Sequence, residues 1–179
     1  MEFTELATNR LILRKFARSD LNFLHNHFSN SQVSEFLYDN EPPKDIEETR
    51  KILNWCMEFN SLTHIRWCIT LAESSTQIGT CGFHRLDRNN NASEIGYDLL
   101  PQFWGQGYMT EALSTMLSCG FEQLDLNRIY AFVFVNNPRS NSLLKKLGFT
   151  LEGVVRDKHL FRGKYYDHNL YSLLKRDSA

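Results

Sequence analysis

The stretch Ser93–Ala112, SEIGYDLLPQFWGQGYMTEA, joins a strand pattern to a helix pattern through a glycine-rich turn. Residues 93–100 are typical of a strand, and after Pro101 apolar residues recur at helical spacing at positions 109, 112, 113, 116, 117 and 120. Gly105 and Gly107 permit a positive φ and a close approach of the backbone to a ligand. Because the first amides of a helix have no partner within it, this turn predicts an anion site, usually one for phosphate.

The same turn has a plainer interpretation as an ordinary tight connection between a strand and a helix. It lacks the lysine of a Walker loop, and it is too short for the dinucleotide pattern GxGxxG. No residues suited to binding a base or a magnesium ion accompany the turn, which disfavours a nucleotide site. The rest of the chain must therefore decide between a structural turn and a binding site.

Strand patterns lie on both sides of the turn. They cover residues 8–14, 65–72, 77–85, 93–100, 128–135, 149–156 and 165–174. Helical patterns cover residues 19–28 and 31–38, where Ser19 and Ser31 are the expected caps, and then residues 46–59, the segment that follows the turn, and 137–147. The order of elements predicts a mixed α/β (α+β) domain with a mostly antiparallel sheet of six or seven strands.

Length, charge and cysteine spacing restrict the function further. The chain has 179 residues, which favours one domain, and its 20 Lys+Arg against 21 Asp+Glu give a net charge of −1. This balance argues against a dedicated nucleic-acid binder. No signal segment or membrane-length apolar run is visible, so the expected location is cytoplasmic. The cysteines lack the spacing of a metal or redox site and are expected to be buried apolar residues: Cys56, Cys68, Cys81 and Cys119.

With these segments in view, the sequence resembles the GNAT superfamily of acyl-CoA-dependent N-acyltransferases. The superfamily motif Gln/Arg-x-x-Gly-x-Gly/Ala is matched by Gln102-x-x-Gly105-x-Gly107, and TNRLILR and NNPRSNSLLKKLGFTLEG occur in the family's order and spacing. The late segment GKYYDHNLYSLL resembles the Rim group (RimJ/RimL), which acetylates the N-termini of ribosomal proteins. The resemblance implies the GNAT fold, with a splayed strand pair flanked by helices, as one domain over residues 1–179 with a core of about 8–176.

The resemblance implies acetyl-CoA as cosubstrate and no metal. The pyrophosphate would lie on the amides of the glycine turn, and the pantetheine arm would lie between the strands at 93–100 and 128–135. Backbone groups of Leu99 and Leu100 would contact the pantetheine and the thioester carbonyl, one of them as an oxyanion donor. The binding residues implied in this way are Leu99, Leu100, Gln102, Gly105, Gln106, Gly107, Tyr108, Met109, Thr110, Asn137 and Ser140.

Three residues are candidates for the chemistry of transfer. Glu94 stands where related histone acetyltransferases have a glutamate that acts as a base through water, although it can equally be an ion-pair partner. His159 replaces a glutamate of the Rim-like enzymes and titrates near neutral pH. Ser140 would lie near the sulfur and relay a proton, while Asn137 and Ser140 also fit as caps of the following helix. The tyrosine acid of many members is replaced by Leu144.

The expected activity is transfer of an acetyl group from acetyl-CoA to a primary amine by direct attack in a ternary complex. The favoured acceptor is the N-terminal α-amine of a protein such as a ribosomal protein, because that amine has a lower pKa than lysine and is easier to deprotonate. Two alternatives stay open: a small amine (a polyamine, an amino acid or an antibiotic) as acceptor, and a non-catalytic acyl-CoA-binding domain. No nucleic-acid or membrane partner is expected, and a homodimer is an open alternative.

Overall fold

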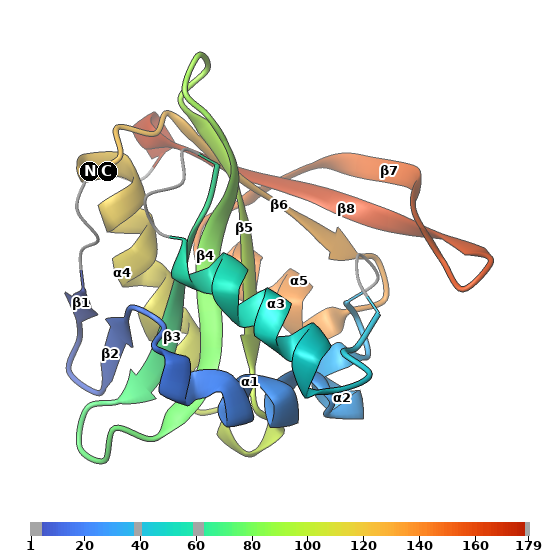
Figure 1. The fold of residues 1–179 in the computed structure, drawn as a ribbon. Helices are drawn as coiled ribbons and strands as arrows, with labels where there is room; N and C mark the ends of the chain where they lie inside the picture. Colours follow the sequence, from blue (N-terminus) through green and yellow to red (C-terminus); the bar gives the residue numbers. More distant parts are fainter. Residues whose placement is uncertain (1–4, 38–40, 59–62, 178–179) are drawn as a thin grey trace.

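The chain forms a single twisted sheet with helices on both faces (Figure 1), and the computed structural model describes residues 5–37, 41–58 and 63–177. The sheet has the strand order β1-β2-β3-β4-β5-β6-β8-β7, and every neighbouring pair is antiparallel except β5 and β6, which run parallel. The strands are β1 (Leu6–Ala7), β2 (Leu11–Arg14), β3 (Ile65–Leu71), β4 (Gln77–Asp87), β5 (Ala92–Leu99), β6 (Arg128–Phe134), β7 (Thr150–Phe161) and β8 (Lys164–Leu174).

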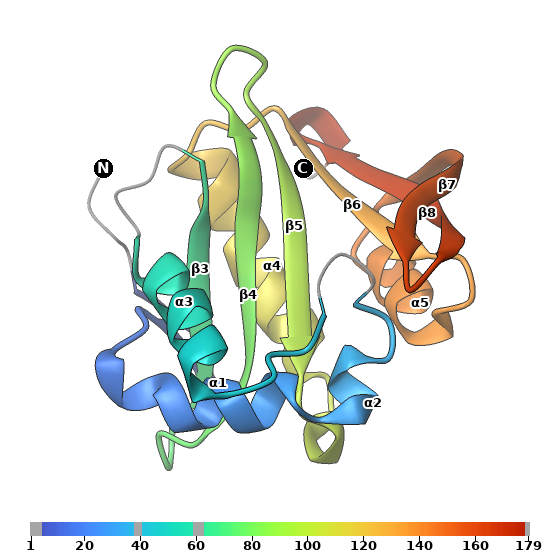
Figure 2. The same cartoon turned by 45° about the vertical axis from the view of Figure 1, so that its right-hand side comes forward.

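The helices divide between the two faces of the sheet. Helices α1 and α3 lie together over one face, and α4 and α5 lie on the opposite face (Figures 1 and 2). The α-helices are α1 (Leu21–Phe28), α2 (Ser31–Ser34), α3 (Ile46–Met57), α4 (Tyr108–Glu122) and α5 (Pro138–Lys146), and the 3-10 turns are η1 (Arg18–Asp20), η2 (Pro101–Phe103) and η3 (Lys175–Asp177). Among the described residues, none of these helices has the length and apolar character needed to cross a bilayer.

The apolar spacing of α4 forms the main core, as the sequence predicts. Ala112, Leu113 and Met116 are fully buried, and Met109, Leu117 and Gly120 are buried beside them. They pack against side chains from β2, β3, β4, β5 and β6 on one face of the sheet. A smaller core on the other face lies under α1 and α3 and consists of Phe16, Leu24, Leu53, Cys56 and Cys68.

All four cysteines are buried and free, and burial raises the pKa of each thiol. A protonated thiol in an apolar setting is a poor nucleophile. Within residues 5–37, 41–58 and 63–177 there is no group of three His, Cys, Asp or Glu side chains able to hold a metal ion. The cysteines therefore act as packing residues, in agreement with the expectation from their spacing.

The structure differs from the expected elements at four places. The cap of α2 is Asn30 and not Ser31, because Asn30 Oδ1 accepts from the Gln32 amide at 2.9 Å. A two-residue strand, β1, pairs with β2 and gives eight strands in all. Strand β7 continues to Phe161 instead of ending at Arg156, because the chain folds back as a long hairpin with β8. Ser19 does not cap α1, since that helix begins at Leu21 after the turn η1. The expected ends at Tyr38 and Phe59 lie outside the described residues.

The parallel pair β5–β6 is short and then opens. The two strands are paired only from Ala92 and Arg128 to Glu94 and Tyr130, although both continue beyond that point. Figure 2 shows them diverging below their paired ends, with α5 beside the opening. This confirms the splayed strand pair implied by the family resemblance. We call the opening between Ile95–Leu99 and the facing part of β6 the β5–β6 gap.

A buried ionic cluster joins three strands to α1 beneath this gap. The carboxylate of Asp98 on β5 accepts hydrogen bonds from Arg66 Nη2 on β3 at 2.5 Å and from Thr80 Oγ1 on β4 at 2.8 Å. His27 Nε2 on α1 lies 2.6 Å from the same carboxylate. Burial by itself raises the pKa of Asp98, but the charge of Arg66 and the contact with His27 outweigh it and hold that pKa below its usual value.

Asp98→Asn is expected to lower the free energy of unfolding by about 3–5 kcal/mol at pH 7, because it leaves the Arg66 charge buried without its partner. A carboxylate with a depressed pKa adds stability above its unfolded pKa of about 3.9, and this contribution disappears as pH falls through the folded pKa. Urea unfolding at pH 7 and near pH 3 measures both effects, and the variant should lose less stability on acidification. Asp125→Asn, which breaks an exposed ion pair with Lys175, is the matched control and should change stability much less.

Gly120→Ala tests the close packing of α4 on the sheet. A Cβ at Gly120 would lie 2.7 Å from Phe83 Cζ and 3.0 Å from Ile129 Cδ1. The added methyl group should cost about 1–3 kcal/mol by overpacking, which exceeds the gain of about 1 kcal/mol in helix propensity, so a net loss is expected. Thermal unfolding measures it, with Ser118→Ala on the exposed side of α4 as control. If Gly120→Ala is as stable as its control, the side chains of Phe83 and Ile129 can move to accept the added methyl group, and the expected overpacking is wrong.

Candidate active site

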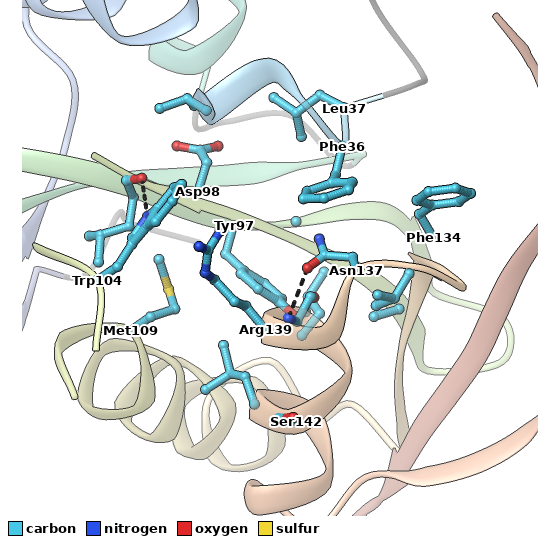
Figure 3. A pocket seen from close by; sticks show the side chains of 18 of the residues that line it. Phe36, Leu37, Tyr97, Asp98, Trp104, Met109, Phe134, Asn137, Arg139 and Ser142 are labelled. Atoms are coloured by element: carbon cyan, nitrogen blue, oxygen red, sulfur yellow. Dashed lines mark hydrogen bonds between the residues drawn. The ribbon is translucent and has the colours of Figure 1, made fainter. Parts of the chain in front are cut away.

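A cavity of about 620 Å³ lies beside the glycine turn and extends into the β5–β6 gap. Its wall is formed by the end of β5, the turn before α4, the start of α5 and part of β6. Figure 3 shows Trp104, Met109 and Arg139 at one end and Phe36, Leu37 and Phe134 at the other, with Tyr97 and Asn137 between them. We call it the glycine-turn cavity.

The turn has the backbone geometry that the glycines predict. Gly105 has φ 73° and Gly107 has φ 81°, both in the left-handed region that favours glycine. Gly107 is the N-cap of α4 and provides no side-chain hydrogen bond, so the amides of the first helical turn keep no partner from a cap. These amides and the positive end of the helix dipole make the turn suitable for a phosphate group.

The turn is braced from the N-terminal segment by Arg10. Arg10 donates to the Glu111 carboxylate at 2.7 Å and to the Gln106 carbonyl at 3.1 Å, and its guanidinium lies 4.4 Å from the centre of the Tyr108 ring. Gln106 Nε2 donates to the carbonyl of Gln102 at 2.8 Å. Gln102 and Gln106 lie outside the cavity wall, so these two predicted binding residues hold the shape of the turn through their own contacts.

Trp104 links the turn to the end of β5. Its indole Nε1 donates to the Leu99 carbonyl at 2.7 Å, and the Arg139 guanidinium of α5 lies 4.2 Å from the centre of its ring (Figure 3). Trp104 and Arg139 both line the glycine-turn cavity. The Leu99 carbonyl therefore already accepts a hydrogen bond within the chain. Arg139 adds a positive charge to the wall of the cavity. No local motif in the sequence singles out Trp104 or Arg139 as residues of the site.

The main-chain groups facing the gap follow from the register of β5. The Leu100 amide donates to the Ile78 carbonyl at 2.8 Å, on the β4 side of the strand. Because the direction of these groups alternates along a strand, the amides of Leu99 and Tyr97 face the gap. Leu100 does not line the cavity, and both of its backbone groups have partners, since its carbonyl accepts from the Phe103 amide at 3.0 Å. The expected contact of Leu100 backbone groups with the pantetheine or the thioester therefore finds no free group there. The role of Leu99 stays a prediction.

Ser140 is held between two partners at the start of α5. Its amide donates to Asn137 Oδ1 at 3.1 Å, which makes Asn137 the helix cap that the sequence predicts. Its hydroxyl lies 2.6 Å from the Tyr97 hydroxyl, and burial raises the pKa of Tyr97, so the phenol stays protonated. Sequence reasoning missed Tyr97 because no local motif joins it to a residue on another element. Tyr97 thus brings a protonated phenol into the site, although position 144 lacks one.

Glu94 and His159 reach the same cavity from opposite strands. Glu94 on β5 lies at the start of the gap, and its carboxylate is 3.1 Å from Arg85 Nη1. His159 on β7 is paired with Tyr166 in the hairpin, and its ring lies edge-on to His168 with 4.8 Å between ring centres. The structure thus gathers these predicted site residues around one cavity: Glu94, Leu99, Gly105, Gly107, Tyr108, Met109, Thr110, Asn137, Ser140 and His159.

A second cavity of about 640 Å³ lies on the opposite face, between α3 and the sheet. We call it the α3 cavity. It shares the β5 residues 94–98 with the glycine-turn cavity, so the two spaces meet at the gap. Four carboxylates line it, and three of them are ion-paired: Glu41 with Arg162, Glu94 with Arg85, and Asp98 with Arg66. A ligand held at the glycine turn and a second molecule in the α3 cavity can therefore meet at β5.

Comparison with known proteins agrees with this arrangement. Residues 10–150 match the Acetyltransferase (GNAT) domain. The chain is 38% identical to YoaA, an N-acetyltransferase of Bacillus subtilis, over 97% of this chain and 98% of the relative. It is 26% identical to a spermidine N(1)-acetyltransferase of Vibrio cholerae, over 89% and 90% of the two chains. The structure of RimL, a ribosomal L7/L12 alpha-N-protein acetyltransferase in complex with coenzyme A, superimposes with a TM-score of 0.87 at 25% identity, covering 98% and 100%.

The match covers most of the chain, and the relatives bear the name N-acetyltransferase. The fold, the free helix start at the glycine turn and the β5–β6 gap supply what binding of acetyl-CoA needs, and the family uses acetyl-CoA as its acetyl donor. The chain belongs to the GNAT family and is an acetyl-CoA-dependent N-acetyltransferase.

Proposed function

We propose that the acceptor is the N-terminal α-amine of a protein or peptide, such as a ribosomal protein, and that it enters through the α3 cavity. The observation that carries the proposal is the charge balance of that cavity, where three of the four lining carboxylates already have cationic partners. A ribosomal acceptor would also place the enzyme in the cytoplasm. The likeness to RimL agrees with this acceptor class.

The charge balance of the α3 cavity favours an acceptor with one positive charge over an acceptor with several. Lys51, Arg66 and Arg85 line the same cavity as the four carboxylates, and Arg162 neutralises Glu41 from outside it. A polyamine carries several positive charges and would be poorly compensated in such a space. A peptide N-terminus brings one charge and a chain of neutral polar groups, which fits a nearly balanced wall.

The acidity of the α-amine also suits this site. Its pKa is about 7.7–8.0 against about 10.4 for lysine, so a substantial fraction is neutral near physiological pH. Glu94 forms an ion pair with Arg85, and a carboxylate is in general a much weaker base than an amine. We assign Glu94 and His159 to accept the amine proton, directly or through water. A weak base suffices for an α-amine and is poorly suited to a lysine side chain.

The departing sulfur needs a proton, and the Tyr97–Ser140 pair can supply it. As the amine nitrogen bonds to the carbonyl carbon and the carbon–sulfur bond breaks, Ser140 gives its proton to the sulfur and takes one from Tyr97. The 2.6 Å contact lets the two hydroxyls share a proton, and the raised pKa of Tyr97 keeps its phenol protonated until the sulfur takes the proton. Water then returns a proton to Tyr97 before the next turnover. The Leu99 and Tyr97 amides facing the gap are suited to stabilise the carbonyl oxygen as it gains negative charge.

An acceptor panel tests the proposed substrate class. The full chain is incubated with acetyl-CoA and one of three acceptors: peptides with free N-termini, spermidine, or free amino acids, and thiol release is followed. We expect kcat/KM for at least one peptide to exceed that for spermidine by tenfold or more. Release with spermidine alone would favour the small-amine alternative. Coenzyme A binding without release for any acceptor would favour a non-catalytic domain.

Ser140→Ala and Tyr97→Phe test the proton path. Each is expected to lower kcat by about 100-fold, a typical loss for one acid–base group, while the affinity for coenzyme A changes little. Because both residues act on one proton, the double variant should fall no further than the lower single variant. If the loss in kcat of the double variant equals the product of the two single losses, the two residues do not share one proton path. Glu94→Gln should lower kcat as well, and an unchanged rate would remove Glu94 from the mechanism.

A further inference from the structure

His84 lies on β4 at the wall of the α3 cavity, next to the β5–β6 gap. Its ring lies against Gly96 of β5, where an added Cβ would be only 2.9 Å from His84 Nε2. Trp55 of α3 stacks over the imidazole with 5.4 Å between ring centres. Because Gly96 has no side chain, the His84 ring can lie against the stretch of β5 that both cavities share.

The protonation of this imidazole follows from its neighbour. Arg66 Nη1 lies 2.9 Å from His84 Nε2, and a guanidinium can only donate, so Nε2 accepts. Arg66 cannot turn away, because Asp98 and Thr80 hold its other nitrogens at 2.5–3.0 Å. A neutral imidazole that accepts at Nε2 carries its hydrogen on Nδ1.

The ring also stays neutral. Burial, together with the positive charge of Arg66, lowers the pKa of His84 to about 3. The other charged or titratable groups around the ring are His64, Asp98 and Arg85, and only Asp98 acts in the opposite direction. Around neutral pH, His84 is therefore a fixed hydrogen-bond donor and not a base.

The donor is open to the cavity. Among residues 5–37, 41–58 and 63–177, His27 Nδ1 is the only buried side-chain nitrogen or oxygen that lacks a hydrogen bond. His84 Nδ1 is therefore not buried away from solvent. The hydrogen bond of the His84 ring to Arg66 uses Nε2, so within the described chain Nδ1–H is unbonded and can be reached from the cavity that the ring lines. A donor in this position needs an acceptor atom from a bound molecule.

We propose that His84 Nδ1–H binds the first carbonyl oxygen of the acceptor, next to the amine, and so selects peptide N-termini over alkylamines. The inference rests on the proposed function, because it assumes that the acceptor occupies the α3 cavity. A neutral fixed donor suits a carbonyl oxygen and gives nothing to an aliphatic amine that lacks one. His84 is thus a specificity-determining residue, held in one protonation state by the Asp98–Arg66–Thr80 cluster.

The variants His84→Gln and His84→Asn test the two ring nitrogens, Nε2 and Nδ1, separately. A glutamine can still accept from Arg66 but has no donor at the position of Nδ1, whereas an asparagine can place its amide near that position and gives up the Arg66 contact. The acceptors are a peptide and its analogue with an (E)-alkene in place of the first amide, which keeps the shape and lacks the carbonyl oxygen. Comparing each variant with wild type on the same acceptor cancels the different basicity of the two amines.

We expect His84→Gln to lower kcat/KM for the peptide about 3- to 10-fold, the usual value of one neutral hydrogen bond, and to leave the alkene analogue unchanged. His84→Asn should recover part of the peptide rate. The pH profile of kcat/KM should keep its position in both variants, since His84 does not titrate in that range. His64→Gln is the matched control, because His64 also stacks on Trp55 and does not line the cavity.

Equal losses on both acceptors, or a shifted pH profile, would overturn the inference while leaving the proposed function intact. Wild-type protein that acetylates no peptide would instead refute the proposed function, and the inference with it, before any variant is measured. Thermal unfolding and coenzyme A affinity of each variant identify a folding defect. If His84→Gln does not fold, His84→Asn decides: a loss on the peptide no larger than that on the alkene analogue supports the proposal, and a larger loss contradicts it.

Discussion

The separation of β5 from β6 after Glu94 is the constraint on which the active site depends. Three residue pairs join these strands, and beyond them the main-chain groups of Tyr97 and Leu99 face an opening instead of a neighbouring strand. Polar main-chain groups removed from water need partners, so such an opening is stable only if something with its own donors and acceptors can fill it. The gap is thus a prepared position for an extended ligand.

Separate contacts on the two faces of the sheet hold the gap open. On the α5 face, the hydroxyl contact between Tyr97 and Ser140 ties β5 to a helix instead of to β6. On the α3 face, Asp98 is bound by groups from β3, β4 and α1. These contacts fix two consecutive residues of β5, whose side chains point to opposite faces of the sheet. The strand therefore keeps its shape at the point where the two cavities meet.

The electrostatics of the two cavities differ in kind. At the glycine turn, negative charge can be balanced by main-chain amides, the helix dipole and a few arginines such as Arg139, so the chain needs no overall excess of basic residues. A net charge of −1 is therefore compatible with a polyanionic substrate. In the α3 cavity, most of the side-chain charges are matched in pairs, and under the proposed function selection there would depend on individual hydrogen bonds more than on attraction at long range.

Local patterns in the sequence predicted the parts of the fold that depend on local physics. The apolar period of α4 and the left-handed glycines at 105 and 107 are confirmed, because helical spacing and positive φ are properties of neighbouring residues. The contact of Tyr97 with Ser140 spans 43 positions and has no local signature. Ser19 was a reasonable cap by residue type, but the neighbouring Asp20 binds Arg14 and the turn η1 displaces the start of the helix. The alternation of strand hydrogen bonds turns the Leu100 amide away from the gap, because the register of β5 against β4 is set by pairing with a distant strand.

The three tryptophans of the chain lie in three different surroundings, with a consequence for how the enzyme can be observed. Trp104 lies against Arg139 at the glycine-turn cavity, Trp55 stacks on two imidazoles at the α3 cavity, and Trp67 is 1% exposed inside the core. Indole fluorescence depends on such surroundings. The unlabelled protein thus carries separate optical reporters for the glycine-turn cavity, the α3 cavity and the folded core, which single tryptophan-to-phenylalanine changes can assign.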